Sequence, residues 1–427
     1  MKWLDKLIQI FKIKDLRKKI FFVMMILVVF RIAANIPIPG IDVERLKQFF
    51  SNNQLFGLMN IFTGGAMSNL SIIMLGLGPF ITSTIIMQLL TMIFPKLEAL
   101  YKEEGEAGRQ KFNQFSRMLA VPMAVLQSYA MLTLLSRQNI ITLISPFQWV
   151  TSIIVATAGA LFLMWLGELI SEKGIGNGVS LLIFAGIVSS VPLSIRELVT
   201  TYSPSQIPSY VAFFIIALII TAGVVVITEG RRNIPVSYAK RVRGNKMYGG
   251  VSTYLPLNVN PAGVIPIIFA LSMMLFPGVI ASFLGGSSIG WLAAFSQVVG
   301  RLFENPWFYG VAYFLLVVLF TYFYTAVTFN PKNVSENLQK MGGFVPGIRP
   351  GKSTTDFLYF ILNRVLLFGA IFLGTIAVLP SIVQGATGIT AFGFVIGGTA
   401  LLIVVSVVLE TMRQINSQLT MRDYEGL

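Results

Sequence analysis

The residues most suggestive of chemistry form a basic loop, PGIRPGKST, at residues 346–354. Its Gly-Lys-Ser ending is typical of a nucleotide-binding loop, in which backbone N–H groups cradle phosphates. The full pattern GxxxxGK[ST] requires a glycine where this chain has Pro346, and Pro350 removes a further backbone donor. The loop therefore does not predict an ATP site, and any work done by this protein must draw its energy from elsewhere.

Other residue types that commonly do chemistry are scarce. The chain has no cysteine and no histidine, which excludes disulfides, thiol nucleophiles, haem ligation by histidine and zinc sites built from these residues. Glu168 and Glu410 stand only at the ends of apolar runs. Arg31 and Arg364 lie near run ends, where a long side chain reaches the membrane interface. We expect no catalytic residue, no metal site and no cofactor, and predict that the chain is not an enzyme.

The composition indicates a protein whose exterior faces lipid. Of 427 residues, 55% are hydrophobic and 12% are charged, whereas soluble proteins carry about 25% charged residues. Ten apolar runs of roughly membrane-spanning length follow one another, and their composition is helical rather than that of alternating barrel strands. The runs are residues 20–38, 72–94, 118–135, 150–170, 179–191, 210–228, 262–283, 308–329, 357–380 and 393–411. We predict an all-α polytopic membrane protein with ten transmembrane helices.

The distribution of basic residues predicts the orientation. Most of the 32 Lys and Arg residues fall in an N-terminal arm at 1–19, in the even-numbered loops and in a tail at 412–427. Because positive charge is enriched in cytoplasmic loops, both termini are predicted to be cytoplasmic. Two of these loops, 229–261 and 330–356, are far longer than typical connections. They are either anchors on anionic lipid or a docking surface for an acidic partner such as a ribosome.

A short apolar segment at residues 55–67 precedes the second run. It contains Gly57, Gly64 and Gly65, and as a helix it would cover about 20 Å of a hydrocarbon core about 30 Å thick. From the residues alone, an interfacial or re-entrant helix is the favoured interpretation. The alternative is a segment that folds back and closes a pore, because its glycines keep the helix marginal and permit close packing.

Several long motifs follow one another along the chain: FTGGAMSNLSI, LGLGPFITSTIIMQLL, EEGEAGRQKFNQFSR, MWLGELISEKGIGNGVSLLIFAGIV, YAKRV, AGVIPIIFA and GGFVPGIRPGKST. Together they resemble the SecY family of bacterial protein-translocation channel subunits over nearly the whole chain. The resemblance implies two five-helix halves of inverted topology, at 20–191 and 210–411, joined by an external loop at 192–209. It also implies an hourglass pore between the halves, with residues 55–67 as a short plug helix.

The resemblance implies roles for particular residues. An apolar pore ring would consist of Leu77, Ile81, Val179, Ile183, Ile265, Ile268 and Ile403. A lateral gate would include Gln88, Gln127 and Ser272. The plug would be formed by Leu55, Phe56, Gly57, Leu58, Met59, Asn60, Ile61, Phe62, Thr63, Gly64, Gly65, Ala66 and Met67. Without the resemblance, such apolar residues usually face lipid or core, and such polar residues are ordinary helix contacts.

The tips of the two basic loops resemble the family's docking site for the motor ATPase SecA and for the ribosome. The site would contact the ribosome through ribosomal RNA. The residues implied are Arg349, Lys352, Arg231, Arg232, Lys240, Arg241 and Arg243. The other implied partners are the membrane subunits SecE and SecG, signal peptides and nascent chains, and membrane lipids.

The resemblance thus implies the central protein-conducting channel of the Sec translocase, in the bacterial cytoplasmic membrane. Such a channel passes unfolded, signal-bearing polypeptides and releases transmembrane helices laterally into lipid, driven by a partner ATPase or ribosome. A secondary transporter of small solutes, with helix breaks at 76–79 and 174–178 forming a midplane site, remains the alternative from another class.

Overall fold

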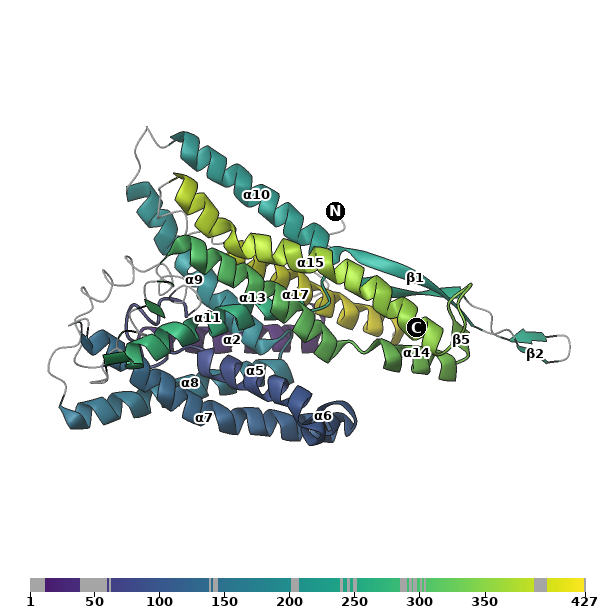
Figure 1. Ribbon diagram of the computed structural model, residues 1–427, viewed down its shortest axis with the longest axis horizontal. Helices are drawn as coiled ribbons and strands as arrows, with labels where there is room; N and C mark the ends of the chain where they lie inside the picture. The colour runs from purple at the N-terminus through teal and green to yellow at the C-terminus, as the bar shows by residue number, and fades with distance from the viewer. Residues whose placement is uncertain are drawn as a thin grey trace.

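The computed structural model describes residues 12–38, 60, 63–137, 140, 145–200, 207–238, 241–243, 246–248, 252–284, 290–291, 294, 298–299, 302, 305–387 and 398–425. Long helices that run side by side dominate this part of the chain, and a small β-sheet extends from one end (Figure 1). A helix satisfies its own backbone hydrogen bonds, so this architecture is suited to lipid.

The long helices coincide with the predicted apolar runs. Across the described ranges, each of the ten runs overlaps one long helix. These are α2 (Lys14–Ala34), α5 (Gly78–Ile93), α7 (Gly105–Arg137), α8 (Pro146–Lys173), α9 (Gly178–Thr200), α10 (Ile207–Glu229), α11 (Ile265–Leu284), α13 (Pro306–Thr328), α15 (Lys352–Thr387) and α17 (Gly398–Glu425).

Within the same ranges, five helices are long and apolar enough to cross a membrane. The number is six if α5 and α6 (Pro95–Lys102), bent by 112°, form one span. The chain is a multi-pass membrane protein.

Capping side chains and prolines set where several helices begin. The Ser145 hydroxyl accepts a hydrogen bond from a backbone N–H of the first turn of α8 at 3.3 Å. Asn305 and Asn330 accept equivalent bonds at the starts of α13 and α14 (Pro331–Lys340). Proline follows each of these three caps, and Pro79 and Pro266 lie in the first turns of α5 and α11. Proline is tolerated there because its missing N–H would have no intrahelical partner.

Some helix boundaries differ from the predicted runs. α5 begins at Gly78 instead of residue 72, because residues 63–77 form a series of turns in which three glycines adopt positive φ. α9 continues to Thr200, so part of the predicted external loop at 192–209 is helical. α2 begins within the predicted arm at 1–19, which makes the end of that arm continuous with the first apolar helix.

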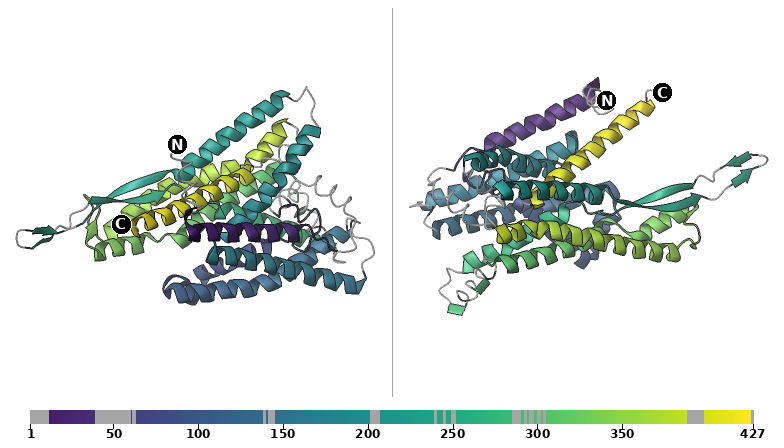
Figure 2. Two further views of the ribbon diagram at one scale, coloured as in Figure 1. Left: turned by 180° about the vertical axis from the view of Figure 1, so that it is seen from behind. Right: turned by 90° about the horizontal axis from the view of Figure 1, so that it is seen from above.

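The two halves of the chain meet along two seams. In Figure 1, α5, α7 and α8 lie below, and α10, α13, α15 and α17 lie above; Figure 2 shows the same grouping from behind. α11, from the second half, packs against α5 and α7, and we call this contact the first seam. α17, also from the second half, packs against α9, and we call this contact the second seam.

The two long basic loops join in one small sheet that sequence analysis did not predict. β1 (Arg231–Tyr238) directly follows α10 and pairs along its length with β4 (Ser252–Asn258) in antiparallel register. The other edge of β1 pairs with β5 (Gly343–Phe344), which belongs to the second loop. We call β1, β4 and β5 the docking sheet. A separate hairpin, β2 (Arg241–Arg243) and β3 (Lys246–Tyr248), extends beyond it.

An apolar cluster beneath the docking sheet explains why these loops are long and ordered. Ile234 and Leu257 from the sheet, Val345 just after β5 and Leu358 from α15 are buried together. Ile234 and Val236 are buried while Pro235 between them is exposed, as expected when alternate side chains of a strand point to opposite faces. The described parts of the two loops are therefore folded together and continue the helices.

Candidate functional site

The side chains predicted to form the pore ring come from four helices or their first turns and belong to one apolar cluster. The buried members are Leu77, Ile81, Ile183, Ile268 and Ile403, and Val179 and Ile265 pack against them from partly buried positions. The four helices are α5 and α11 of the first seam and α9 and α17 of the second. This cluster is the large apolar core to which both halves contribute, and the seven ring candidates within it are all aliphatic.

Hydrogen bonds fix the start of α9, which carries two of these residues. The Gly178 N–H donates to the Ser171 hydroxyl at 2.9 Å, and this hydroxyl donates to the Gly167 carbonyl at 3.0 Å. The Asn177 side chain caps the helix by accepting from the Ser180 N–H at 3.2 Å. An added Cβ at Gly178 would lie 1.8 Å from the Gly167 carbonyl oxygen, so only glycine permits this approach of α9 to α8.

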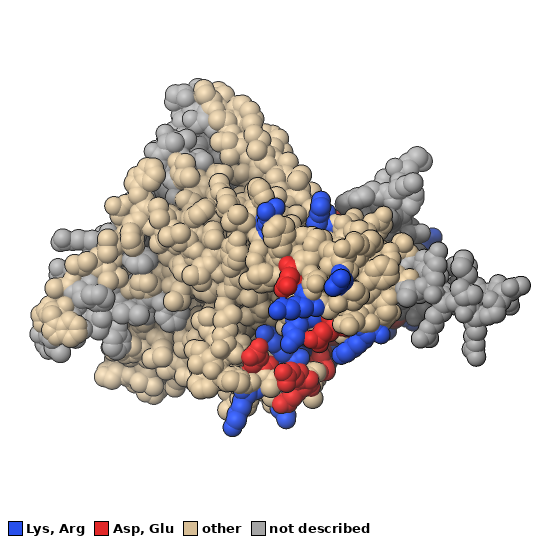
Figure 3. Space-filling model, turned by 45° about the vertical axis from the view of Figure 1, so that its right-hand side comes forward, with Lys and Arg blue, Asp and Glu red and all other residues tan. Residues whose placement is uncertain are grey.

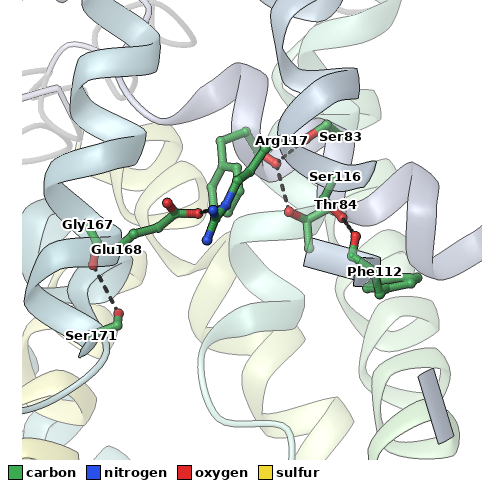
Figure 4. Close-up of polar contacts among 9 residues, drawn as sticks. Ser83, Thr84, Phe112, Ser116, Arg117, Gly167, Glu168 and Ser171 are labelled. Carbon is green, nitrogen blue, oxygen red and sulfur yellow. Dashed lines mark hydrogen bonds and ion pairs between the residues drawn. The ribbon is translucent and has the colours of Figure 1, made fainter. Parts of the chain in front are cut away.

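An ion pair ties the neighbouring helices of the first half. Arg117 of α7 pairs with Glu168 of α8, and Figure 4 shows their side chains meeting between these two helices. Both side chains are partly exposed, so the pair adds little to stability by itself. It does give the Glu168 carboxylate a partner at the end of an apolar helix.

The predicted gate residues lie on helices of the first seam. Gln88 and Ser272 are buried in α5 and α11, and Gln127 of α7 is partly buried. The Gln127 amide donates to the Thr82 hydroxyl at 3.4 Å, a long contact. Among the described residues, the side-chain oxygen of Gln88 has no hydrogen-bond partner. An unpaired buried acceptor costs about 1–3 kcal/mol, so the Gln88 oxygen lowers rather than raises the stability of the described packing.

The described part of the predicted plug packs against α9. Asn60, Thr63, Gly64, Gly65, Ala66 and Met67 are described, and Thr63, Gly64, Ala66 and Met67 among them are buried. The Gly64 backbone approaches α9 so closely that an added Cβ would lie 3.0 Å from the Gly186 Cα. Arg31, near the end of α2, donates to the Gly64 carbonyl at 2.5 Å and to the Ser189 hydroxyl at 3.2 Å. These contacts join α2, the turn after residue 62 and α9, and nothing in the sequence indicated them.

The tip of the second basic loop, which carries Arg349 and Lys352, is exposed, and hydrogen bonds to its backbone carbonyls hold it in place. Arg349 and Lys352 are exposed, whereas Val345 beneath them is buried. The Thr354 hydroxyl donates to the Arg349 carbonyl at 2.9 Å, and the Ser335 hydroxyl of α14 donates to the Gly351 carbonyl at 2.9 Å. The Arg349 guanidinium is thus presented to solvent from a fixed backbone.

Charged side chains gather at the end of the molecule that carries the docking sheet. Figure 3 shows Lys, Arg, Asp and Glu side chains grouped there, next to a broad uncharged surface. Arg231 and Arg232 at the start of β1 are exposed in the same region. An end rich in charge beside an apolar body is the distribution expected of a membrane protein with one large water-exposed face.

Some predicted site residues lie outside the described residues. These are the plug residues Leu55, Phe56, Gly57, Leu58, Met59, Ile61 and Phe62 and the docking residue Lys240. For Arg241 and Arg243 the structure describes only the backbone, in β2.

Solved structures with the same architecture are protein-conducting channels. A structure described as that of a protein-conducting channel matches with a TM-score of 0.63 and 19% identity, covering 93% of this chain and 91% of that one. Sec61 from a canine ribosome–channel complex of the endoplasmic reticulum matches with a TM-score of 0.60 and 18% identity, with the same coverage. The fold is thus that of the SecY and Sec61 channels.

Sequence comparisons define the family. The family model described as SecY matches residues 71–412. The protein translocase subunit SecY of Streptomyces galbus is 44% identical, with 97% of this chain and 98% of the relative covered. That of Corynebacterium glutamicum is 43% identical, with coverage of 99% and 100%. The chain belongs to the SecY family, as the sequence motifs predicted.

Proposed function

We propose that this chain is the protein-conducting channel of a Sec translocase, which passes unfolded, signal-bearing polypeptides across a membrane. The observation that carries the proposal is that seven aliphatic side chains from helices of both halves belong to the same large apolar cluster. Membership of the SecY family and a fold shared with protein-conducting channels support the same conclusion.

The chemistry of the ring suits a channel for polypeptides of any sequence. Aliphatic side chains make no specific hydrogen bonds, so the ring does not discriminate among the side chains of a passing polypeptide. Between substrates, a narrow apolar constriction resists water and ions because it dewets. The proposed plug, residues 55–67, would add a second barrier on one side of the ring.

The first seam is the proposed lateral gate. α5 and α7 meet α11 there, and α5 carries the buried Gln88, whose side-chain oxygen has no partner among the described residues. Polar contacts between membrane helices typically contribute about 0.6 kcal/mol each. A seam with few such contacts can separate at modest cost and let an apolar helix pass into lipid.

Partners supply the driving force in this proposal. The exposed Arg349, Lys352, Arg231 and Arg232 surround the docking sheet and suit an acidic surface, either the motor ATPase SecA or ribosomal RNA. The membrane subunits SecE and SecG would complete the complex. The location follows as the bacterial cytoplasmic membrane, with both termini and the docking sheet on the cytoplasmic side.

A secondary transporter of small solutes is not proposed. Such proteins usually hold a coupling ion with ionisable groups or helix ends near the membrane midplane. Here Glu168 pairs with Arg117 near the end of its helix, and Glu410 is exposed. Neither carboxylate therefore supports a midplane ion site.

Ring variants test the proposed channel directly. Replacing Ile183 and Ile403 together by glycine should raise the resting ion conductance of the reconstituted complex in planar bilayers several-fold, because the constriction widens. Ile154→Gly is the control, because Ile154 is 61% exposed on α8, and each glycine in a helix carries a helix-propensity cost of about 1 kcal/mol. Unchanged conductance in the ring variant, with folding intact, would remove the assigned constriction.

A further inference from the structure

Two consecutive residues of α17 hold two different elements at the charged end of the molecule. The Arg413 guanidinium donates to the Glu229 carboxylate at 2.6 and 3.0 Å and to the Thr228 carbonyl at 2.8 Å. The Gln414 side-chain oxygen accepts a hydrogen bond from the Gly176 N–H at 2.7 Å. One short stretch of helix thus contacts the end of α10 and the turn before α9.

The first contact is made at the base of the docking sheet. Thr228 and Glu229 are the last residues of α10, and β1 begins at Arg231. The Val259 N–H, just after β4, donates to the Gly230 carbonyl at 2.9 Å and closes the base. When docking displaces the sheet, the displacement must therefore act on the end of α10, the segment that Arg413 holds.

The second contact is made next to the ring. Gly176 precedes α9 by two residues, and α9 carries Val179 and Ile183 in its first two turns. Gly176 adopts φ +91°, and an added Cβ there would lie 3.4 Å from the Thr411 hydroxyl of α17. The start of α9 packs against α8 without free space at Gly178. A shift of the turn at Gly176 therefore moves the ring residues of α9 with it.

α17 itself connects both contacts to the ring. It is one continuous helix, and its residue Ile403 is fully buried in the ring cluster. Ten residues of helix, about 15 Å, separate Ile403 from Arg413. Ile415 is buried with Leu16 of α2 and Ile175 in a small apolar cluster, which holds this end of α17 in place.

We propose that Arg413 and Gln414 are positioning residues that transmit displacement of the docking sheet to the pore ring through α17 and α9. This inference rests on the proposed function and adds to it a path between docking and opening. The Arg413 and Glu229 side chains are 35% and 43% exposed, so their pair contributes little to the stability of the fold. The role of the pair is then to couple the end of α10 to α17, so that these two elements move together.

The missing native cysteines allow a direct test on the reconstituted complex. Ile183→Cys reports ring opening through its rate of modification by a membrane-impermeant maleimide. Adding SecA with a non-hydrolysable ATP analogue should accelerate labelling in this parent. Arg413→Gln and Gln414→Leu should each reduce that acceleration at least about 5-fold, the lower end of couplings between sites, with SecA affinity unchanged.

Matched variants separate transmission from folding. Gln414→Glu keeps an oxygen that accepts from Gly176 and should behave as the parent. The double reversal Arg413→Glu with Glu229→Arg should restore the ion pair and with it part of the response, because a carboxylate at position 413 cannot donate to the Thr228 carbonyl. Lys102→Gln, which removes an exposed ion pair within α6, should change nothing. Full acceleration in Arg413→Gln and Gln414→Leu would overturn the proposed transmission. A parent that fails to bind SecA would overturn the proposed docking function, whereas a parent that binds SecA without acceleration would overturn the transmission and leave docking intact.

Discussion

Arg31 connects three segments of the chain through a single guanidinium. It donates to the Gly64 carbonyl in the turn after residue 62 and to the Ser189 hydroxyl on α9, and it extends from α2. Ser189 in turn donates to the Gly186 carbonyl at 2.8 Å, so the hydroxyl is oriented to accept from Arg31. If residues 55–67 act as the plug, Arg31 holds the base of the plug against the ring helix.

Arg31→Gln should therefore raise the resting ion conductance of the reconstituted complex. The shorter, neutral side chain loses the charge-assisted hydrogen bonds, which are about twice as strong as neutral ones. Arg196→Gln is the control, because Arg196 is an exposed arginine on the same helix α9. Equal conductance in Arg31→Gln and the parent, measured in planar bilayers, would show that Arg31 does not hold the plug.

Arg349 is the docking residue whose loss should be most costly. Arg349→Glu should abolish SecA-driven translocation into vesicles while leaving the protein folded, because it places a carboxylate opposite an acidic partner. Lys340→Glu, also exposed, makes the same charge change on α14 and should have a smaller effect. Normal ATP-dependent export by Arg349→Glu would refute the docking role.

At this scale, the resemblance to the family supplied the ring, gate and docking residues, and the structure places the ring residues in one cluster. The hydrogen bonds of Arg31, Arg413 and Gln414 could not be predicted. Each joins residues that are far apart in the sequence, and a single arginine or glutamine near a run end carries no periodic signal.

The packing of α9 on α8 illustrates how an element positions the ring. Both helices contribute a glycine to the contact, but the two glycines differ in the space around them. An added Cβ at Gly178 would meet the Gly167 carbonyl oxygen at 1.8 Å. An added Cβ at Gly167 would meet only ordinary contacts, at 3.5 Å or more.

Gly178→Ala should therefore destabilise the protein by about 2 kcal/mol or more, within the range for overpacked cores. Gly167→Ala, in the same contact, should be nearly neutral. Thermal unfolding of the two variants in detergent measures the difference. Equal Tm values for the two variants would contradict the tight approach of α9 to α8.

Helices were predictable at this scale, but the docking sheet was not. The apolar runs predict helices because a lipid-exposed backbone must bond within its own segment. β5 has only two residues, and it pairs with β1 from the other loop, where Ser237 lies opposite Phe344 far along the sequence. No local pattern of alternation can reveal such pairing. The start of α5 was placed too early because residues 72–77 are apolar yet form turns.

At the scale of the whole molecule, helices of both seams carry buried polar side chains. Gln88 of α5 and Thr399 and Ser406 of α17 each have a side-chain oxygen without a hydrogen-bond partner among the described residues. The second seam, α17 against α9, is reinforced by the Gln414–Gly176 hydrogen bond and by the cluster around Ile415. A fixed contact of this kind suits the second seam for the transmission proposed above.

A channel of this kind requires polypeptide to pass between the two halves through the aliphatic ring. The most direct measurement uses Ile183→Cys and a secretory chain stalled during translocation, with Ile154→Cys on the exposed face of α8 as control. We expect a crosslink between the stalled chain and position 183 and little at position 154. Absence of the adduct at 183, or equal adducts at both positions, would contradict passage through the ring.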